Sequence, residues 1–337
     1  MNVEQTLFHP VISSADLPVA EPIAATLLGQ ALVLWRDELG AARAFADQCP
    51  HRGAALSLGK VVHLQGKARL QCAYHGWQFD GAAQCQHVPA QPRWQPPPGL
   101  CARAYACVES QGMVWVCLQP NALAAVPRFA LDADATWVHA ISGPYAVSTS
   151  APRLVENFLD MTHFGFVHEG FLGDALHTEL DAYAVQENIG PEMPAVVVPD
   201  CAVWQPNAFE AESGAAGHLV RYRYEVLAPY TVTLIKLGEQ GRLFIAMLNC
   251  PLNDSAAGDA QHTKTWFWIA ASGLGQTPQQ LSAFQDLIFA QDLAVVESQT
   301  PKSLPLGGTE LHGPLDRVSA AYRRYLKRIG ASVGVIG

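Results

Sequence analysis

The sequence predicts an α+β protein with two domains. An all-β domain should cover residues 1–125, and residues 126–337 should form a twisted antiparallel sheet with flanking helices, an arrangement of the helix-grip type. Three observations support this prediction. Apolar runs of strand length alternate with turn residues in the first part, strand patterns recur between residues 180 and 271, and capping signals mark two helices near the C-terminus.

The composition excludes several classes of protein. The 337 residues are enough for two domains with cores, and half of them are apolar while 15% are charged, as in globular proteins. A net charge of −9 argues against nucleic-acid binding. No apolar run approaches the roughly 18 residues needed to span a membrane, and Met1–Gln5 lacks the features of a secretory signal. We therefore expect a cytoplasmic protein whose remaining cysteines are reduced thiols.

The first domain should consist of short strands. Residues 31–35 and 113–117 are apolar runs bounded by glycine, proline and polar residues, as expected for strands. Between them, residues 88–99 contain five prolines, which exclude a helix or a central strand. This stretch should be an extended covering segment.

The second domain should combine strands with helices. Residues 219–226 alternate between apolar and polar side chains, and residues 243–248 and 265–269 are candidates for buried strands. Ahead of this sheet, residues 154–167 should form one helix. Another helix should begin at Pro278, after the N-cap Thr277, and run to about Gln299. The last helix, over residues 316–329, should end at the C-cap Gly330.

Two short segments of the first domain carry possible metal ligands. They are Cys49-Pro50-His51-Arg52-Gly53 and Cys72-Ala73-Tyr74-His75-Gly76-Trp77. Two thiolates and two imidazoles are the ligand set of a Rieske [2Fe–2S] cluster. A zinc site uses the same ligand types and a disulfide could join the cysteines, but the neighbouring residues favour the cluster. Twenty residues separate His51 from Cys72, and the surplus, residues 60–69, should be a lengthened hairpin tip.

A second candidate site begins in the predicted helix over residues 154–167. Asn157, Asp160, His163 and His168 are polar residues in an otherwise bulky, apolar stretch. Buried polar groups need partners, so a site is favoured over a solvent-facing stripe. On a regular helix the two histidines would point about 140° apart. Both can reach one metal only if a π-bulge, which we expect at Gly165, widens the helix, or if His168 lies just past its end.

The helix after Pro278 should supply the third ligand. Its apolar seam consists of Leu281, Phe284, Ile288 and Val295. Asp292 lies on the same face, and a buried carboxylate there would need a counter-charge such as a metal. Asp286 is the alternative, but it should face solvent, about 160° around the helix from Ile288. Two histidines and one carboxylate form the facial triad of oxygen-activating non-heme iron sites.

With both motifs present, the chain resembles the terminal oxygenase component of the Rieske non-heme iron oxygenases. The resemblance covers nearly the whole chain and includes the Asn-x2-Asp-x2-His-x4-His run and residues 289–299. It is strongest to single-subunit monooxygenases and demethylases. It implies a Rieske domain whose Cys49, His51, Cys72 and His75 hold the cluster, and a mononuclear Fe(II) held by His163, His168 and Asp292.

The family's chemistry follows from this resemblance. An NAD(P)H-dependent reductase or a ferredoxin would supply electrons through the cluster to the iron, which activates O2. A small aromatic or heterocyclic substrate would then be hydroxylated or lose an O- or N-methyl group. The alternatives are a cis-dihydroxylating ring dioxygenase, which would give a diol, and a Rieske electron-transfer protein without an active site, which would hold two irons instead of three.

The resemblance also assigns roles to Asn157 and Asp160 in the catalytic machinery. It implies a homotrimer in which Asp160 joins His163 to His75 of the partner subunit, so that electrons cross between chains. The alternative is a carboxylate that only orients His163 within its own subunit. The pocket walls are less defined. Candidates are Phe158, Phe164, Val167, Asn249, Trp266 and Leu293, although plain core is the favoured interpretation of each.

Overall fold

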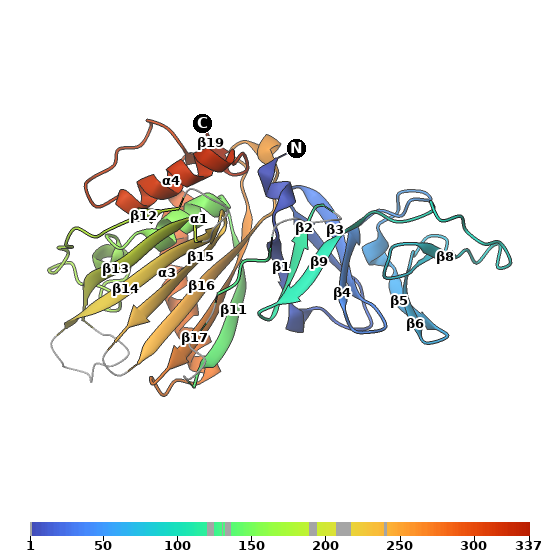
Figure 1. Ribbon diagram of the computed structural model, residues 1–337, viewed down its shortest axis with the longest axis horizontal. Helices are drawn as coiled ribbons and strands as arrows, with labels where there is room; N and C mark the ends of the chain where they lie inside the picture. Colours follow the sequence, from blue (N-terminus) through green and yellow to red (C-terminus); the bar gives the residue numbers. More distant parts are fainter. Residues whose placement is uncertain are drawn as a thin grey trace. The chain divides into compact units, whose positions relative to one another are not determined.

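The chain forms two units in a computed structural model that describes residues 2–119, 125–129, 131, 136–188, 194–206, 217–238 and 241–337. The units are Met1–Val126 and Pro127–Gly337 (Figure 1). None of the helices in these described ranges is long and apolar enough to cross a lipid bilayer. The α+β fold class is confirmed.

The first unit contains two antiparallel sheets. One has six strands in the order β1-β10-β9-β4-β3-β2, and the other has four in the order β5-β6-β7-β8. The strands are β1 (His9–Ser13), β2 (Ile23–Leu27), β3 (Gln30–Arg36), β4 (Ala42–Ala46), β5 (Lys60–Leu64), β6 (Lys67–Gln71), β7 (Gln78–Phe79), β8 (Cys85–His87), β9 (Ala104–Ser110) and β10 (Met113–Cys117). Short 3-10 helices are η1 (Val3–Thr6), η2 (Ser14–Asp16) and η3 (Leu56–Leu58).

The sequence predictions for this unit are confirmed at three places. The two predicted strands are β3 and β10, and residues 88–99 contain neither helix nor strand. The lengthened hairpin is the β5–β6 pair. Its tip, Gln65-Gly66, has φ values of +53° and +76°, the left-handed backbone that suits a tight hairpin turn. The surplus residues therefore extend this hairpin away from the two cysteine- and histidine-bearing loops.

The second unit is built on a seven-stranded antiparallel sheet in the order β11-β17-β16-β15-β14-β13-β12. The strands are β11 (Val138–Val147), β12 (Gln186–Glu187), β13 (Val196–Gln205), β14 (His218–Ala228), β15 (Thr231–Leu237), β16 (Arg242–Pro251) and β17 (Thr263–Ser272), with a separate parallel pair, β18 (Leu304–Pro305) and β19 (Val335–Ile336). The helices are α1 (Ala151–Leu159), α2 (Phe164–Val167), α3 (Pro278–Ser298) and α4 (Arg317–Ile329), and η4 (Ser255–Ala257) is a 3-10 turn.

Three helices share one core with this sheet. Helix α3 packs against β11 and β17, α1 against β15 and β16, and α4 against β13 (Figure 1). Along β16, Leu243, Ile245 and Met247 alternate toward this core, where they join helix residues such as Leu154 and Phe289. Period-two burial on the strands thus produces a single apolar face that the helices cover.

The capping predictions are confirmed. Helix α3 begins with a capping box, in which Thr277 Oγ1 accepts from the Gln280 amide at 3.2 Å and Gln280 Oε1 accepts from the Thr277 amide at 2.9 Å. Helix α4 ends at Gly330, which has φ of +72°.

The prediction of one continuous helix over residues 154–167 is wrong. Helix α1 ends at Leu159, and α2 is a separate turn that begins at Phe164. Asp160 Oδ1 accepts hydrogen bonds from both the amide and the hydroxyl of Thr162 at 2.7 Å. This local bonding gives the backbone an alternative to the helix and ends α1 at that point.

Candidate functional site

The two loops of the first unit share one backbone turn. In the first, the Cys49 amide donates to the Ala54 carbonyl at 2.8 Å, and the Gly53 amide donates to the Cys49 carbonyl at 2.9 Å. In the second, the Cys72 amide donates to the Trp77 carbonyl at 2.9 Å, and the Gly76 amide donates to the Cys72 carbonyl at 3.1 Å. Both glycines have φ above +70° (+73° and +71°), which favours glycine at these positions. The same pair of backbone hydrogen bonds therefore shapes both loops, although the histidine follows the cysteine by two residues in the first loop and by three in the second.

The side chains of these loops are arranged with sulfur inside and imidazole outside. Cys49 and Cys72 are only 3% and 2% exposed, whereas His75 lies at the surface and His51 is half-buried. The two imidazole rings meet edge to face with centroids 4.6 Å apart. Trp77 stacks on His51 at 4.3 Å, with the rings nearly parallel. The four donor groups therefore converge from two loops.

The chemistry of these donors fits a [2Fe–2S] cluster. His51 Nδ1 is buried and has no hydrogen-bond partner in the structure. Burial, with a contribution from the neighbouring Cys72 thiol, raises the pKa of Cys49 to about 11. All eight cysteines are free thiols. Two buried thiols and two imidazoles, one with an unpartnered nitrogen, are the donors that a Rieske cluster takes.

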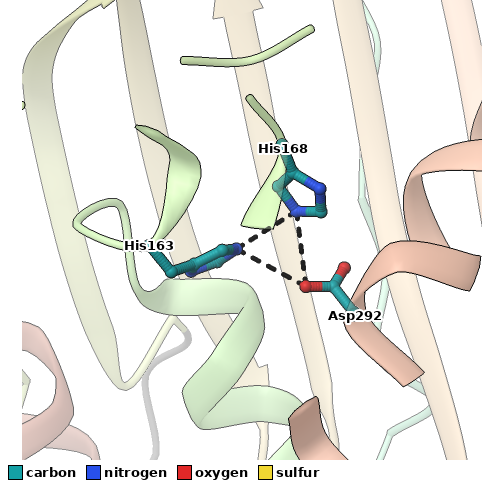
Figure 2. Close-up of side chains that lie close together, drawn as sticks. All are labelled: His163, His168 and Asp292. Atoms are coloured by element: carbon teal, nitrogen blue, oxygen red, sulfur yellow. Dashed lines mark hydrogen bonds and ion pairs between the residues drawn. The ribbon is translucent and has the colours of Figure 1, made fainter. Parts of the chain in front are cut away.

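In the second unit, three predicted ligands come together. His163 Nε2 lies 3.2 Å from His168 Nε2, and Asp292 Oδ1 lies 3.5 Å and 3.3 Å from these two nitrogens. Figure 2 shows the two rings and the carboxylate pointing toward one another. Three donors about 2.1 Å from one ion, on one face of its coordination sphere, would lie roughly 3.0–3.5 Å apart. Their spacing fits a single metal ion.

The short helix α2 brings the two histidines together. His163 immediately precedes α2, and His168 lies just past its end, which confirms one of the two predicted alternatives. The other, a π-bulge at Gly165, is wrong, because the break in the helix falls at Asp160. Gly165 instead permits close packing, since a Cβ there would lie 3.0 Å from the Asp174 carbonyl oxygen.

Asp292 belongs to the buried face of α3. That face consists of Leu281, Gln285, Ile288, Phe289, Asp292 and Val296. It differs from the predicted seam, because Val295 is 43% exposed. Asp286 faces solvent as expected, and its carboxylate accepts a hydrogen bond from Tyr145.

Each of the three converging residues has a polar neighbour. Asn157 Nδ2 donates to Asp292 Oδ1 at 3.2 Å. Gln291 Oε1 lies 2.8 Å from His168 Nδ1 and can only accept, so Nδ1 carries the proton and the Nε2 lone pair faces the other donors. Gln291 was not among the residues predicted from the sequence, although a polar residue beside Asp292 on a largely apolar helix was a usable signal.

Asp160 faces the remaining nitrogen of His163. Its Oδ2 lies 3.5 Å from His163 Nδ1, too long for a well-formed hydrogen bond, so this buried nitrogen has no hydrogen-bond partner. Burial acts to raise the pKa of Asp160, but the nearby His163 ring and the hydrogen bonds from Thr162 outweigh it and lower the pKa. The carboxylate is thus held in its charged form beside His163.

Two cavities meet at these residues. One is narrow, about 70 Å³, with apolar walls that include Phe158, Phe164, Leu234, Met247, Phe267 and Ile288. The other, about 220 Å³, is lined by polar and charged groups that include Glu156, Asp160, Glu310, His312 and Arg323. Asn157 and His163 line both.

Only some of the six predicted wall residues line a cavity in the structure. Phe158 and Phe164 line the apolar cavity, whereas Val167 lines the polar one. Asn249 is fully buried, with its amide bonded to the Tyr230 carbonyl and the Thr265 hydroxyl. Trp266 and Leu293 are not among the residues that line either cavity.

An ion-pair network that the sequence analysis missed forms part of the polar cavity's wall. Arg153, which is 2% exposed, bonds Glu310 at 2.7 Å. Arg323 bonds Glu156 at 2.6 Å and Glu310 at 2.5 Å. The network, defined by these four residues, joins α1, α4 and the loop that carries Glu310. It therefore fixes the helix from which Asn157 projects.

Comparison with known proteins shows similarity over both units. Residues 8–107 match the Rieske [2Fe-2S] domain, and residues 147–332 match the C-terminal domain of vanillate O-demethylase oxygenase. Methylxanthine N1-demethylase NdmA of Pseudomonas putida is 32% identical over 335 residues, which cover 96% of this chain and 88% of that protein. Methylxanthine N3-demethylase NdmB of the same species is 30% identical, with 96% and 89% covered. The structure of NdmA with caffeine superposes with a TM-score of 0.77 at 28% identity, covering 96% of this chain and 90% of that one.

Proposed function

This chain belongs to the Rieske non-heme iron oxygenases, as an oxygenase component of the demethylase branch, and on that premise we propose that it removes an N-methyl group from a small heteroaromatic compound. Its cofactors are a [2Fe–2S] Rieske cluster and a mononuclear non-heme iron, and its electrons come from a reductase or a ferredoxin. The choice of an N-methyl substrate is supported by the two methylxanthine demethylases that match nearly the whole chain.

The observation that carries the proposal is the position of the three converging residues beside an apolar cavity. His163, His168 and Asp292 would hold the mononuclear iron, and their common side faces a cavity with aromatic walls. Cys49, His51, Cys72 and His75 would hold the cluster. When bound, the two groups supply electrons and oxygen activation. We assign residues 1–125 to the domain that would bind the cluster and residues 126–337 to the catalytic domain.

The protein's own residues would then position the reactants. Asn157 would fix the Asp292 carboxylate, and Gln291 would fix the tautomer of His168. The apolar cavity would exclude bulk water and hold a flat ring with one methyl group near the three ligands. Insertion of one oxygen atom into that methyl C–H bond gives an N-hydroxymethyl compound, which releases formaldehyde.

We further propose that the protein is a cytoplasmic homotrimer. In this arrangement Asp160 would connect His163 to His75 of the partner subunit and serve as the route for electrons between chains. Asp160 and His163 line the polar cavity, so this side of the site is accessible to a residue of a partner subunit. The cavity is therefore compatible with such a contact. Asp160→Asn should keep the trimer and both iron groups but slow electron transfer to the iron roughly tenfold or more. A monomer with full activity would refute the scheme.

The function is tested by coupled turnover. The purified protein, supplied with NADH and a surrogate reductase, is offered N-methylated and O-methylated aromatic compounds, and O2 uptake and formaldehyde are measured together. We expect formaldehyde in step with O2 uptake for at least one N-methyl compound. A cis-diol would indicate a dioxygenase instead. If the cluster is reduced but none of the compounds is oxidised, the protein would be an electron carrier.

A further inference from the structure

Four aromatic side chains connect the apolar cavity with the outside of the second unit. Phe158 and Phe267 line the cavity, and their ring centroids lie 6.4 Å apart. Phe267 contacts Phe289 edge to face at 4.9 Å, and Phe289 contacts Tyr145 edge to face at 4.8 Å. We call these four residues the aromatic array. Tyr145 is its only member with a polar group.

The hydroxyl group of Tyr145 has a charged acceptor. It donates to Oδ1 of Asp286, a residue of α3 that is exposed to solvent. Burial and the neighbouring carboxylate both raise the pKa of Tyr145, so the phenol carries its proton in the resting protein. The array therefore ends in a phenol that is hydrogen-bonded to a carboxylate at the surface.

The other members of the array lie next to the proposed iron site. Phe289 precedes Asp292 by three residues, which is about 4.5 Å along the axis of α3. Asp286 precedes Asp292 by six residues, or about 9 Å. Neither Tyr145 nor Asp286 lines either of the two cavities, so the proposed demethylation does not use them.

An oxygen-activating site with apolar walls is exposed to its own oxidant. When no methyl group is within reach, the nearest side chains are the only groups left to oxidise. Tyrosine gives up an electron more easily than phenylalanine, and it loses its phenolic proton when it does so. A carboxylate within hydrogen-bonding distance can accept that proton. Tyr145 is therefore the member of the array from which an electron is most easily removed.

We propose that Tyr145 and Asp286 form a redox-active pair that protects the iron site when it is oxidised without a substrate. One electron passes from Tyr145 across the phenylalanine rings to the oxidised site, and the phenolic proton moves to the Asp286 carboxylate. This step leaves a neutral tyrosyl radical and a carboxylic acid. A small reductant in solution, such as a thiol or ascorbate, then loses one electron to the radical while Asp286 returns the proton.

This inference rests on the proposed function, because the iron site is the source of the oxidant. Two rounds of the step remove the two oxidising equivalents of one peroxide molecule. Hydrogen peroxide therefore tests the pair without a substrate or a reductase. The purified holoenzyme, with ferrous mononuclear iron and an oxidised, EPR-silent cluster, is mixed with peroxide and frozen at short intervals for EPR spectroscopy.

The EPR signal tests the two residues directly. We expect the hyperfine pattern of a tyrosyl radical in the wild type and its loss in Tyr145→Phe. In Asp286→Asn the radical should form at least about tenfold more slowly, because the proton acceptor is missing. Tyr183→Phe is the control, since Tyr183 lies outside the array and bonds the Leu315 carbonyl, which cannot take its proton. No radical in the wild type, or an unchanged signal in Tyr145→Phe, overturns the inference.

Oxidative damage provides a second readout. After the same treatment, peptide mass spectrometry measures the oxygen added to the segments that carry Phe158, His163 and His168. Tyr145→Phe should contain more added oxygen than the wild type, although the two have the same melting temperature and iron content before treatment. Tyr183→Phe should match the wild type. If Tyr145→Phe fails to fold, Asp286→Asn, a change at an exposed residue, provides the same comparison. Equal damage in the wild type and in these array variants overturns the inference.

Turnover separates this inference from the proposed function. If the Tyr145 radical forms but no methylated compound yields formaldehyde, the proposed function fails and the role of the pair stands. If formaldehyde forms but Tyr145→Phe behaves like the wild type toward peroxide, the proposed function stands and this inference fails.

Discussion

The two proposed metal sites of this protein are built in different ways. The cluster loops each carry a cysteine and a histidine within a few residues, and each loop is shaped by hydrogen bonds within its own backbone. The three proposed iron ligands come from two segments more than a hundred residues apart. Two of them flank α2 and the third lies on α3, so they meet only through tertiary packing. The first site is therefore local and the second depends on tertiary structure.

Exposure follows the same division. The cluster loops place His75 at the surface, where another protein can approach. The proposed iron ligands are withdrawn, with His168 only 1% exposed and Asp292 7% exposed, and they adjoin an apolar cavity. We expect damage to one site to leave the other intact, and the following variants test this independence.

The largest effect is expected for Asp292→Ala. Loss of the carboxylate should abolish turnover, reducing it by about a thousandfold or more, while the visible spectrum of the cluster stays unchanged. Oxygen uptake and absorbance spectra measure the two results. Asp286→Ala, which removes an exposed carboxylate from the same helix, is the control and should remain active. Turnover by Asp292→Ala would mean that another carboxylate acts.

His75→Ala should remove the function of the other site. The variant should lose the EPR signal of a reduced Rieske centre, with its low average g value, and with it the electron supply for turnover. Its mononuclear iron should still bind, since the three proposed ligands lie in the other unit. A wild-type EPR spectrum in this variant would exclude His75 as a cluster ligand.

A smaller effect is expected for Gln291→Leu. Without an acceptor for its Nδ1 proton, His168 should lose its fixed tautomer, and the affinity for Fe(II) should fall about 10- to 100-fold. Equilibrium dialysis of the iron against a chelator measures this affinity. Gln291→Glu retains an acceptor oxygen and should retain most of the binding. If both variants bind iron equally weakly, loss of packing explains the result better than loss of the hydrogen bond.

The smallest effect concerns stability. Burial acts to raise the pKa of Glu310, but hydrogen bonds from Arg153 and Arg323 outweigh it and lower the pKa below the ordinary value of 4.5. The folded state therefore favours the charged carboxylate, so its contribution is present above pH 4.5 and is lost as the pH falls below it. Glu310→Gln should lower the free energy of unfolding, measured with urea at pH 7, by about 2 kcal/mol. The difference from the wild type should shrink near pH 3.5, and a constant difference would contradict this explanation.

The contrast between the sites also explains what the sequence could predict. The Cys49 and Cys72 loops could be recognised because their spacing is short and their neighbours shape the backbone locally. Asp292 could be found because a carboxylate on an apolar helix face is unusual. The break at Asp160 was missed because a side-chain hydrogen bond to Thr162, rather than a glycine or proline, ends α1.

The most direct test of the central claim, two independent iron sites in one chain, is the metal and sulfide content of the purified protein. We predict about three irons and two acid-labile sulfides per chain in the wild type. Asp292→Ala should contain about two irons and two sulfides, and Cys72→Ser about one iron and no sulfide. Two irons in both the wild type and Asp292→Ala, or the loss of all iron in either variant, would contradict the account.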